Sequence, residues 1–466
     1  MNYFWNTLEQ FNDNICAVTS DGRSFLYKEV IEKADSLKTV LSSKSLVAIF
    51  CRNDYETLVG YVGVLRSQSI ALLINDTLDP EVTATLLATY SPDYVWSRKN
   101  EEVAIASIGE YSLKKRDVDL GDMLHPDLKL LLSTSGSLGS PKLVKLSSQN
   151  IQSNAKSIAS YLNLSPTELP ITTLNMSYSY GLSVINSHLL SGAGILLTDA
   201  SLMTPNFWNL IKEKKVTSFA GVPFIYEMLD RLRFEQMDLP SLKTMTQAGG
   251  KLPLFLAKKF AHITHKKNIN FYIMYGQTEA TARISYLSPD QVMKKYTSIG
   301  KAIPGGTLEI VDDKGDVIEM PNKIGELVYH GKNVMMGYAK TRCELSKGDE
   351  MNRTLRTGDL SSFDEEGFFY IQGRKSRFIK LFGNRVNLDE IDHFLSEEGF
   401  ECVTGGEDEQ LSVAVVGNDR VSHQQIKRLI TKRFRYHHSA ISLIAIPEIP
   451  RNSSGKILYE KVFSKN

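Results

Sequence analysis

The chain has 466 residues, more than one ordinary hydrophobic core supports, so two or more domains are expected. Its 54 Lys and Arg residues and 53 Asp and Glu residues leave a formal net charge of +1, which offers no global field to attract nucleic acid or an acidic membrane surface. Hydrophobic residues make up 42% and charged residues 23%, a balance typical of a soluble globular protein.

The sequence contains no evident secretion or membrane signal. Residues 1–6 lack the basic and apolar regions of a signal peptide. Residues 169–198 carry no Asp, Glu, Lys or Arg, but proline, asparagine and glycine interrupt them, so we expect a buried substrate-lining region rather than a bilayer span. The four cysteines have no paired spacing and are expected to be reduced, which favours a cytoplasmic protein.

Strands and helices alternate from residue 44 to residue 275. The first predicted elements are a buried strand at 44–51, a helix at 54–66, a strand at 70–74, a helix near 80–89 and a strand at 93–96. The later ones are helices at 150–162, 207–214, 223–233 and 253–265 and strands at 217–220, 242–247 and 270–274. This alternation predicts layered α/β subdomains with largely parallel sheets, in which ligands bind at the carboxyl ends of strands.

The pattern changes at Gly300 to short strands and turns, which predicts a β-rich subdomain. The last stretch alternates again, with strands at 378–381, 411–416 and 441–446 and helices at 388–397 and 422–434. We therefore predict an α/β multi-domain protein. A large N-terminal domain of residues 1–375 combines the layered α/β subdomains with the β-rich one, and residues 376–466 form a small, mobile C-terminal α+β domain.

A loop of hydroxyl residues and glycines runs from Thr134 to Lys142, directly after an apolar strand. Glycine lets the backbone approach a polyanion closely, and backbone N–H groups, hydroxyls and a lysine are all donors to phosphate. The loop therefore suits the phosphates of a nucleotide, with a plain turn as the alternative. It is not a Walker A loop, because Pro141 precedes the lysine, so a P-loop kinase or GTPase is disfavoured.

Four further motifs follow the loop in order. They are Tyr275-Gly276-Gln277-Thr278-Glu279, Thr357-Gly358-Asp359, Gly373-Arg374 with Ile379-Lys380 and Gly383, and Gly455-Lys456. The order and spacing of the five motifs resemble the adenylate-forming superfamily of acyl-CoA synthetases, aryl-acid ligases, luciferases and peptide-synthetase adenylation domains. The resemblance extends from about residue 45 to the C-terminus.

The resemblance implies a site for ATP and Mg²⁺. Tyr275 would stack on adenine, Thr278 would donate to the α-phosphate and Glu279 would hold Mg²⁺, roles that suit an aromatic face, a hydroxyl and a hard oxygen ligand. The other nucleotide-binding residues implied are Thr134, Ser135, Gly136, Ser137, Gly139 and Lys142 on the phosphates, Gly249, Gly250 and Gly276 beside the base, and Asp359 and Arg374 at the ribose. Each of these motifs taken alone would also fit an ordinary turn or a solvated charge.

The resemblance implies two further roles for lysines of the small domain. Lys456 would bridge the substrate carboxylate and the α-phosphate, where a cation stabilises the charge of the transition state. Lys380 and Gly383 would belong to the face used in the second step, with the glycine letting a pantetheine arm pass close to the backbone. A solvated lysine on an edge strand is the alternative for Lys380.

The resemblance places the acyl pocket near Tyr178, Tyr180, Gly221 and Val222. Amino-acid-activating relatives have an aspartate for the substrate ammonium, and the matching position here is Tyr178. An unpaired buried ammonium is costly, so an amino-acid substrate is disfavoured. The two tyrosines either line an aryl or acyl pocket or pack in the core.

The predicted function is a two-step ligase. The carboxylate of a small-molecule acid attacks the α-phosphate of Mg·ATP to give acyl-AMP and pyrophosphate, and the small domain then rotates so that a thiol takes the acyl group. That thiol belongs to coenzyme A or to the phosphopantetheine of a carrier protein, and either acceptor is expected in trans. An amide synthetase and a non-catalytic acyl- or nucleotide-binding relative stay open, although retention of Lys142, Glu279, Asp359 and Lys456 favours an enzyme.

Overall fold

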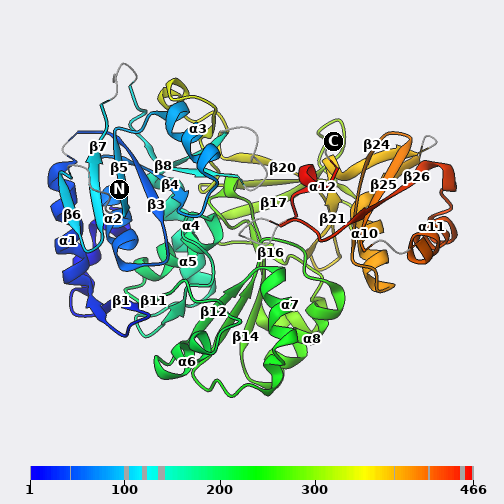
Figure 1. The fold of residues 1–466 in the computed structure, drawn as a ribbon, viewed down its shortest axis with the longest axis horizontal. Helices are drawn as coiled ribbons and strands as arrows, with labels where there is room; N and C mark the ends of the chain where they lie inside the picture. The colour runs from blue at the N-terminus through cyan, green and yellow to red at the C-terminus, as the bar shows by residue number, and fades with distance from the viewer. Residues whose placement is uncertain are drawn as a thin grey trace. The chain divides into compact units, whose positions relative to one another are not determined.

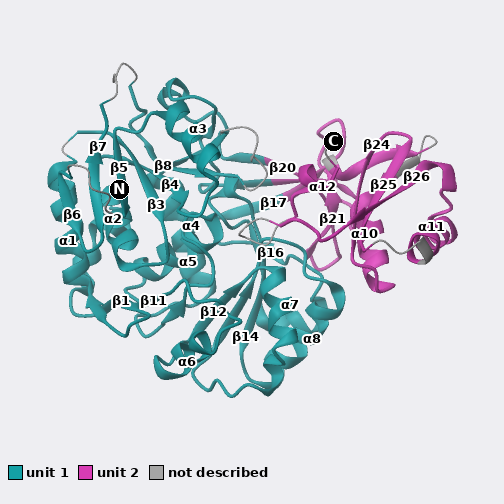
Figure 2. Ribbon diagram, viewed as in Figure 1, with its two compact units in different colours: residues 1–308, 329–355 teal, residues 309–328, 356–466 magenta. Residues whose placement is uncertain are grey.

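The computed structural model describes residues 2–41, 43–98, 104–117, 123–134, 142–381, 384–417, 420–451 and 457–463. They form two compact units, shown in teal and magenta in Figure 2. Unit 1 comprises residues 1–308 and 329–355, and unit 2 comprises residues 309–328 and 356–466. The fold is mixed α/β with several sheets, as the sequence predicts. The predicted domain boundary between residues 375 and 376 falls inside unit 2 and stays a prediction.

The first sheet of unit 1 has eight strands in the order β19-β9-β8-β4-β3-β5-β7-β6. Its strands are β3 (Leu46–Cys51), β4 (Ile70–Asn75), β5 (Tyr94–Arg98), β6 (Ala106–Ile108), β7 (Tyr111–Lys115), β8 (Leu128–Ser133), β9 (Leu143–Ser147) and β19 (Gly337–Ala339). The central strands pair in parallel and are buried, because helices cover parallel sheets on their faces. The helices associated with this part of the chain are α1 (Tyr27–Val40), α2 (Tyr55–Arg66) and α3 (Pro80–Tyr90).

The second sheet has nine strands in the order β16-β15-β14-β13-β12-β10-β11-β1-β2. Its strands are β1 (Ile15–Thr19), β2 (Ser24–Leu26), β10 (Pro170–Ile171), β11 (Ile195–Leu197), β12 (Ser218–Gly221), β13 (Thr244–Gln247), β14 (Asn270–Tyr275), β15 (Ser285–Leu287) and β16 (Lys301–Ala302). Its helices are α6 (Pro205–Glu213), α7 (Pro223–Arg231), α8 (Leu254–Lys266) and α9 (Pro289–Lys295). Strands β10 to β14 are parallel, as the alternating pattern predicts.

Helices α4 (Ser148–Tyr161) and α5 (Ser179–Leu190) lie between the two sheets of unit 1 (Figure 1). On one side of α5, Leu182, Ile185 and Leu189 belong to the hydrophobic core that includes Val144 and Leu146 of the first sheet. Its other side faces β12, β13 and β14 of the second sheet. No helix in the part of the chain that the structure describes has the length and apolar character needed to cross a bilayer. The uncharged residues 169–198 fold instead into β10, α5 and β11.

The C-terminal part of the chain contains three smaller sheets. A four-stranded sheet has the order β17-β18-β20-β21, a hairpin pairs β22 with β23, and a three-stranded sheet has the order β24-β25-β26. The strands are β17 (Gly306–Val311), β18 (Gly325–Gly331), β20 (Thr354–Phe363), β21 (Phe369–Arg374), β22 (Phe378–Leu381), β23 (Asn384–Asn387), β24 (Cys402–Glu407), β25 (Gln410–Val416) and β26 (Ile441–Ile446). The helices are α10 (Leu388–Glu397), α11 (Arg420–Phe434) and α12 (Tyr459–Phe463). The predicted strands and helices of this region are confirmed to within a few residues.

A buried lysine ties the first sheet of unit 1 to helix α2. Lys129 on β8 is 6% exposed, and its Nζ donates to the carbonyls of Val64 (3.1 Å), Ser67 (2.6 Å) and Ser69 (3.0 Å). The last carbonyls of a helix lack intrahelical donors, so the ammonium supplies partners at the end of α2. Burial lowers the pKa of Lys129 to about 7.

We expect the Lys129→Met substitution to lower the free energy of unfolding by about 3 kcal/mol, because three buried carbonyls lose their donor. The difference between wild type and variant should grow from about pH 7 to pH 10.5, since the unfolded lysine still binds its proton there while the folded one releases it. Urea unfolding at several pH values measures both effects.

Lys44→Met is the matched control. Lys44 is half-buried, and its Nζ donates to the carbonyls of Pro126 (2.8 Å) and Leu128 (3.2 Å). We expect this substitution to cost less than about 1 kcal/mol, since water can replace the lost donor at a partly exposed site. Equal losses in the two variants would contradict a special role for Lys129.

Candidate nucleotide and acyl site

Three parallel strands of the second sheet deliver predicted residues to one edge. Gly221 pairs with Gln247, and Gln247 pairs with Ile273, so β12 and β13 end at the same level and β14 ends two residues farther on. The segments that follow these strands carry Val222, Gly249-Gly250 and the motif that begins at Tyr275. The carboxyl ends of parallel strands are the usual place for a ligand. The structure therefore gathers three segments with predicted site residues around one edge of unit 1.

The motif after β14 is tightly anchored. Thr278 and Glu279 lie in a short 3-10 turn, η4 (Thr278–Ala280). The Oγ1 of Thr278 shares a hydrogen bond of 3.1 Å with the Oγ of Ser179, at the start of α5. A Cβ at Gly276 would overlap the carbonyl of Ala282, so only glycine fits there. The Thr278 hydroxyl is thus held by packing rather than left to vary with a mobile loop.

Glu279 is at one end of a line of three side chains whose middle member is Tyr338. Its Oε1 accepts a hydrogen bond of 2.8 Å from the hydroxyl of Tyr338, and its backbone carbonyl accepts one of 2.8 Å from the N–H of Met335. The Nζ of Lys142 lies 3.3 Å from the centre of the Tyr338 ring. A cation over an aromatic face is attracted by the ring quadrupole, so Tyr338 holds an anion at its hydroxyl and a cation at its face.

The donor set fits Mg²⁺ bound together with a nucleotide. Among the described residues no group of three His, Cys, Asp or Glu side chains could hold a metal ion by itself. Mg²⁺ in nucleotide sites is held by one or two carboxylates and by phosphate oxygens and waters, which suits a single Glu279. Burial and the neighbouring Glu279 raise the pKa of Tyr338, so its hydroxyl stays protonated and remains a donor to the carboxylate.

The residues predicted beside adenine lie next to one another in unit 1. Gly249 has φ +85°, a conformation that favours glycine, and a Cβ there would lie 2.8 Å from the hydroxyl of Tyr178. The Nε2 of Gln247 donates to the carbonyl of Gly250 (2.8 Å), and the Nε2 of Gln277 donates to the hydroxyl of Tyr275 (3.2 Å). This backbone surface can approach a planar base closely.

The predicted ribose residues lie in unit 2. Asp359 on β20 pairs with Arg374 on β21, and the Nε of Arg374 lies 3.3 Å from an oxygen of Asp359. Asp359 is 4% exposed, whereas Arg374 reaches into solvent. Lys380 on β22 is exposed, and its backbone N–H donates to the carboxylate of Asp408 (2.8 Å). The roles of these residues stay predictions.

Part of the predicted site lies outside the described residues. These positions are Ser135, Gly136, Ser137, Gly139, Gly383 and Lys456. Thr134, which directly follows β8, and Lys142, which directly precedes β9, are the described ends of the Ser/Gly loop.

Of the predicted acyl-pocket residues, Tyr180, Gly221 and Val222 are buried, and Tyr178 at the start of α5 is partly buried. Tyr178 is the N-cap of α5, and burial raises its pKa to about 12. The hydroxyl of Tyr180 donates to the carbonyl of Thr246 (3.0 Å), and the two rings lie edge to face at 6.4 Å. Gly221 leaves no room for a side chain beside Tyr226, and Val222 is the N-cap of α7. Tyr180 is therefore a hydrogen-bonded core aromatic.

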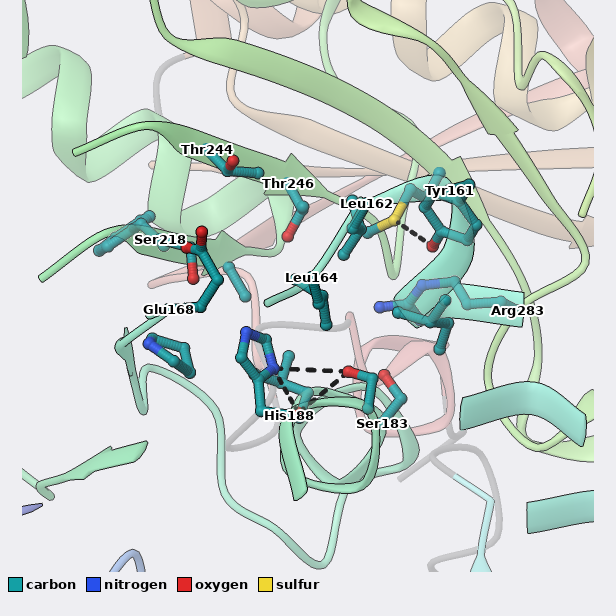
Figure 3. A pocket seen from close by; sticks show the side chains of 17 residues that line it. Tyr161, Leu162, Leu164, Glu168, Ser183, His188, Ser218, Thr244, Thr246 and Arg283 are labelled. Atoms are coloured by element: carbon teal, nitrogen blue, oxygen red, sulfur yellow. Dashed lines mark hydrogen bonds between the residues drawn. The ribbon is translucent and has the colours of Figure 1, made fainter. Parts of the chain in front are cut away.

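Two functional candidates escaped the sequence analysis. Tyr338 follows Gly337, which has φ +130°, and its link to Glu279 spans 59 residues. Arg283 lines a cavity together with residues of α4, α5, β12 and β13 (Figure 3). An aromatic after a glycine and an arginine near the end of a motif are weak signals, because only tertiary contacts give them their partners.

A protein-family model described as "AMP-binding enzyme" matches residues 4–339. The chain belongs to this family. As an AMP-binding enzyme of the acyl-CoA synthetase type it is an AMP-forming acid–thiol ligase. It activates a carboxylic acid with ATP and Mg²⁺ as an acyl-adenylate, releases pyrophosphate and transfers the acyl group to a thiol of the coenzyme A or phosphopantetheine kind. The resemblance found in the sequence is confirmed.

Individual relatives are similar over nearly the whole chain. A 2-succinylbenzoate–CoA ligase of Oceanobacillus iheyensis is 25% identical over 94% of this chain and 94% of its own length. An indoleacetate–CoA ligase of Aromatoleum aromaticum is 26% identical over 82% of this chain and 75% of its own. The structure of o-succinylbenzoate CoA synthetase from Bacillus subtilis with its acyl-adenylate intermediate superposes with a TM-score of 0.82 at 21% identity, over 100% of this chain and 99% of that one.

We expect Tyr338→Phe to raise the Mg²⁺ concentration needed for half-maximal adenylation about tenfold, because the Glu279 carboxylate loses a charge-assisted hydrogen bond. A magnesium titration of ATP–pyrophosphate exchange measures this shift. Tyr90→Phe is the matched control, since its hydroxyl donates to the carbonyl of Ala339 (2.6 Å), on the same strand as Tyr338. A shift of the same size in both variants would show that the Tyr338 hydroxyl acts only on the packing of β19.

Proposed function

We propose that this enzyme is an aromatic-acid–coenzyme A ligase in which Thr278, Glu279, Lys142 and Lys456 act on the acid and ATP. The anchored line of Lys142, Tyr338 and Glu279, beside the Thr278–Ser179 pair, is the observation that carries the proposal. It combines a cation, a hydroxyl and a carboxylate at a strand edge, which are the groups that a metal-bound triphosphate requires.

The relatives support the choice of acid and acceptor. Both curated relatives named above are CoA ligases for aromatic acids, and neither name refers to a carrier protein. The start of α5 offers aromatic rings and hydroxyls at Tyr178 and Ser179 and no carboxylate for a substrate ammonium. An aromatic acid therefore fits better than an amino acid. The free cysteines accord with a reducing cytoplasm, where both ATP and coenzyme A are supplied.

The first step joins the acid to AMP. An oxygen of the substrate carboxylate bonds to the α-phosphorus, and the bond from that phosphorus to the pyrophosphate oxygen breaks. We assign Thr278 as donor to the α-phosphate, Lys142 as counter-charge to the leaving phosphates and Lys456 as the cation between carboxylate and α-phosphate. Glu279 would hold Mg²⁺, which would neutralise charge on the phosphates.

The second step transfers the acyl group. The thiolate of coenzyme A attacks the acyl carbon, the thioester bond forms, and the bond from that carbon to the AMP oxygen breaks. We assign Asp359 and Arg374 to the ribose, because two carboxylate oxygens suit a vicinal diol. Lys380 and Gly383 are assigned to the passage of the pantetheine arm, and the small domain of residues 376–466 is assigned the movement between the steps.

ATP–pyrophosphate exchange with a panel of aromatic acids tests the first step. We expect Lys456→Ala to slow exchange at least about 100-fold and Glu279→Gln about 10- to 100-fold, in the range found for removing one preorganised charged group. The controls Lys461→Ala and Glu319→Gln change exposed residues and should leave exchange unaltered. Unaltered exchange in both site variants would remove the mechanism.

Acceptor preference is tested separately. AMP release from the loaded enzyme is compared with coenzyme A, a phosphopantetheinylated carrier protein and a primary amine. We expect coenzyme A to be the fastest acceptor. Faster release with the amine would make the enzyme an amide synthetase, and faster release with the carrier protein would move it to the carrier-loading ligases.

A further inference from the structure

Arg283 is a buried cation without a counter-ion. It is 3% exposed, and no carboxylate among the described residues forms an ion pair with it. Its Nη1 donates to the carbonyl of Ala282 (3.3 Å), and its guanidinium carbon lies 4.0 Å from the centre of the Tyr180 ring. Its Nε is buried and has no hydrogen-bond partner. A guanidinium has five N–H donors, and the Nε–H of this one is buried and unsatisfied.

The guanidinium lines a cavity between α4, α5 and strands β12 to β14 (Figure 3). The volume of the cavity is about 30 Å³, which admits two water molecules or a group of carboxylate size. Arg283 is the one Lys or Arg among the lining residues, and Glu168 is the one acid. Figure 3 shows Glu168 and Arg283 at opposite sides of the cavity. The end at Arg283 is therefore positive and uncompensated.

His188 does not change the sign of this charge. Its Nδ1 lies 2.7 Å from the carbonyl of Val184, which fixes that nitrogen as the N–H donor. Burial lowers the pKa of His188 to about 4, so the ring is neutral and its Nε2 is a buried acceptor without a partner. The cavity thus has a cationic donor at one side and a neutral acceptor on α5.

Helix α5 links this cavity to the reacting end of the site. Ser179, which contacts Thr278, and Ser183, which lines the cavity, are four residues apart on that helix. Four residues of α-helix rise by about 6 Å. A group at Arg283 therefore lies on the order of one helical turn from the position proposed for the reacting carboxylate.

We propose that Arg283 binds a second anionic group of the acid, so that the enzyme selects dicarboxylic over monocarboxylic aromatic acids. This inference rests on the proposed function for the position of the reacting carboxylate. An unpaired buried charge is costly, and a carboxylate that accepts a bidentate hydrogen bond from the guanidinium relieves that cost. An acid without this group leaves Arg283 unpaired and binds poorly.

Matched pairs of acids test the selection. 2-Succinylbenzoate and 4-oxo-4-phenylbutanoate differ only in the ring carboxylate, and 2-carboxyphenylacetate and phenylacetate form a second pair. We expect the wild-type kcat/KM for pyrophosphate release to be at least about 100-fold higher for the diacid of a pair, because a site built to pair a polar group rejects the analogue that lacks it. Equal use of both members of each pair would overturn the inference.

Substitutions of Arg283 test whether its charge causes the preference for diacids. Arg283→Met should reduce the preference below about tenfold, because kcat/KM for the diacid falls while kcat/KM for the monoacid does not. The substitution should not destabilise the fold, since it removes a buried charge that the folded state carries at a cost. Arg283→Lys keeps the charge without the bidentate geometry and should keep a weakened preference. Arg98→Met, at an exposed ion pair with Glu110 (3.0 Å), is the control and should behave as wild type. An unchanged preference in both Arg283 variants would also overturn the inference.

A binding measurement distinguishes this failure from failure of the proposed function. The shift in melting temperature caused by each acid alone needs no catalysis. We expect the diacids to stabilise wild type and not Arg283→Met, even if no acid of the panel supports pyrophosphate release. Stabilisation without turnover would contradict the proposed function alone. Diacids that stabilise wild type and Arg283→Met equally, or stabilise neither, would contradict the binding role of Arg283.

Discussion

The parallel register of β12, β13 and β14 is the constraint on which the site depends. Because Gly221, Gln247 and Ile273 are aligned across the three strands, the chain leaves each strand at the same edge. The same register decides which side chains face α5, since alternate residues of a strand share a face. A slip of one residue would turn the cavity-lining Thr244 and Thr246 to the opposite face of the sheet.

The sequence predicted those elements whose local pattern agrees with their surroundings. Helix α2 and strand β4 are apolar runs bounded by polar residues, Asp54 and Arg66 for the helix and Ser69 and Asn75 for the strand, so they were found within a residue or two. Helix α5 was missed because it is packed between two sheets and is buried on nearly every side. Like α2 it has no polar face to give the 3.6-residue period of a surface helix, and unlike α2 it has no Asp, Glu, Lys or Arg to mark its ends.

Side chains that act through tertiary contacts were beyond the reach of the sequence. The motif at Tyr275 is contiguous and could be recognised, but the Tyr338 that orients Glu279 comes from a strand of the other sheet. Likewise, the sequence alone would place Arg283 on the surface, because arginine side chains are mostly exposed to solvent. Only the packing of Tyr180 and the surrounding strands shows that Arg283 is enclosed and lacks an acid.

Two cations of the proposed site, Lys142 and Arg283, are held in different ways. This difference suits Lys142 to the bond-breaking step and Arg283 to substrate selection. Lys142 is half-buried and contacts an aromatic face, so its flexible ammonium can follow phosphates that move apart as a bond breaks. Arg283 is enclosed, and its planar fork cannot move or lose its proton. A fixed buried charge contributes little to bond cleavage, because the group it pairs with does not change charge during the reaction. It discriminates strongly before the reaction, since an acid that lacks the partner group must leave it unpaired.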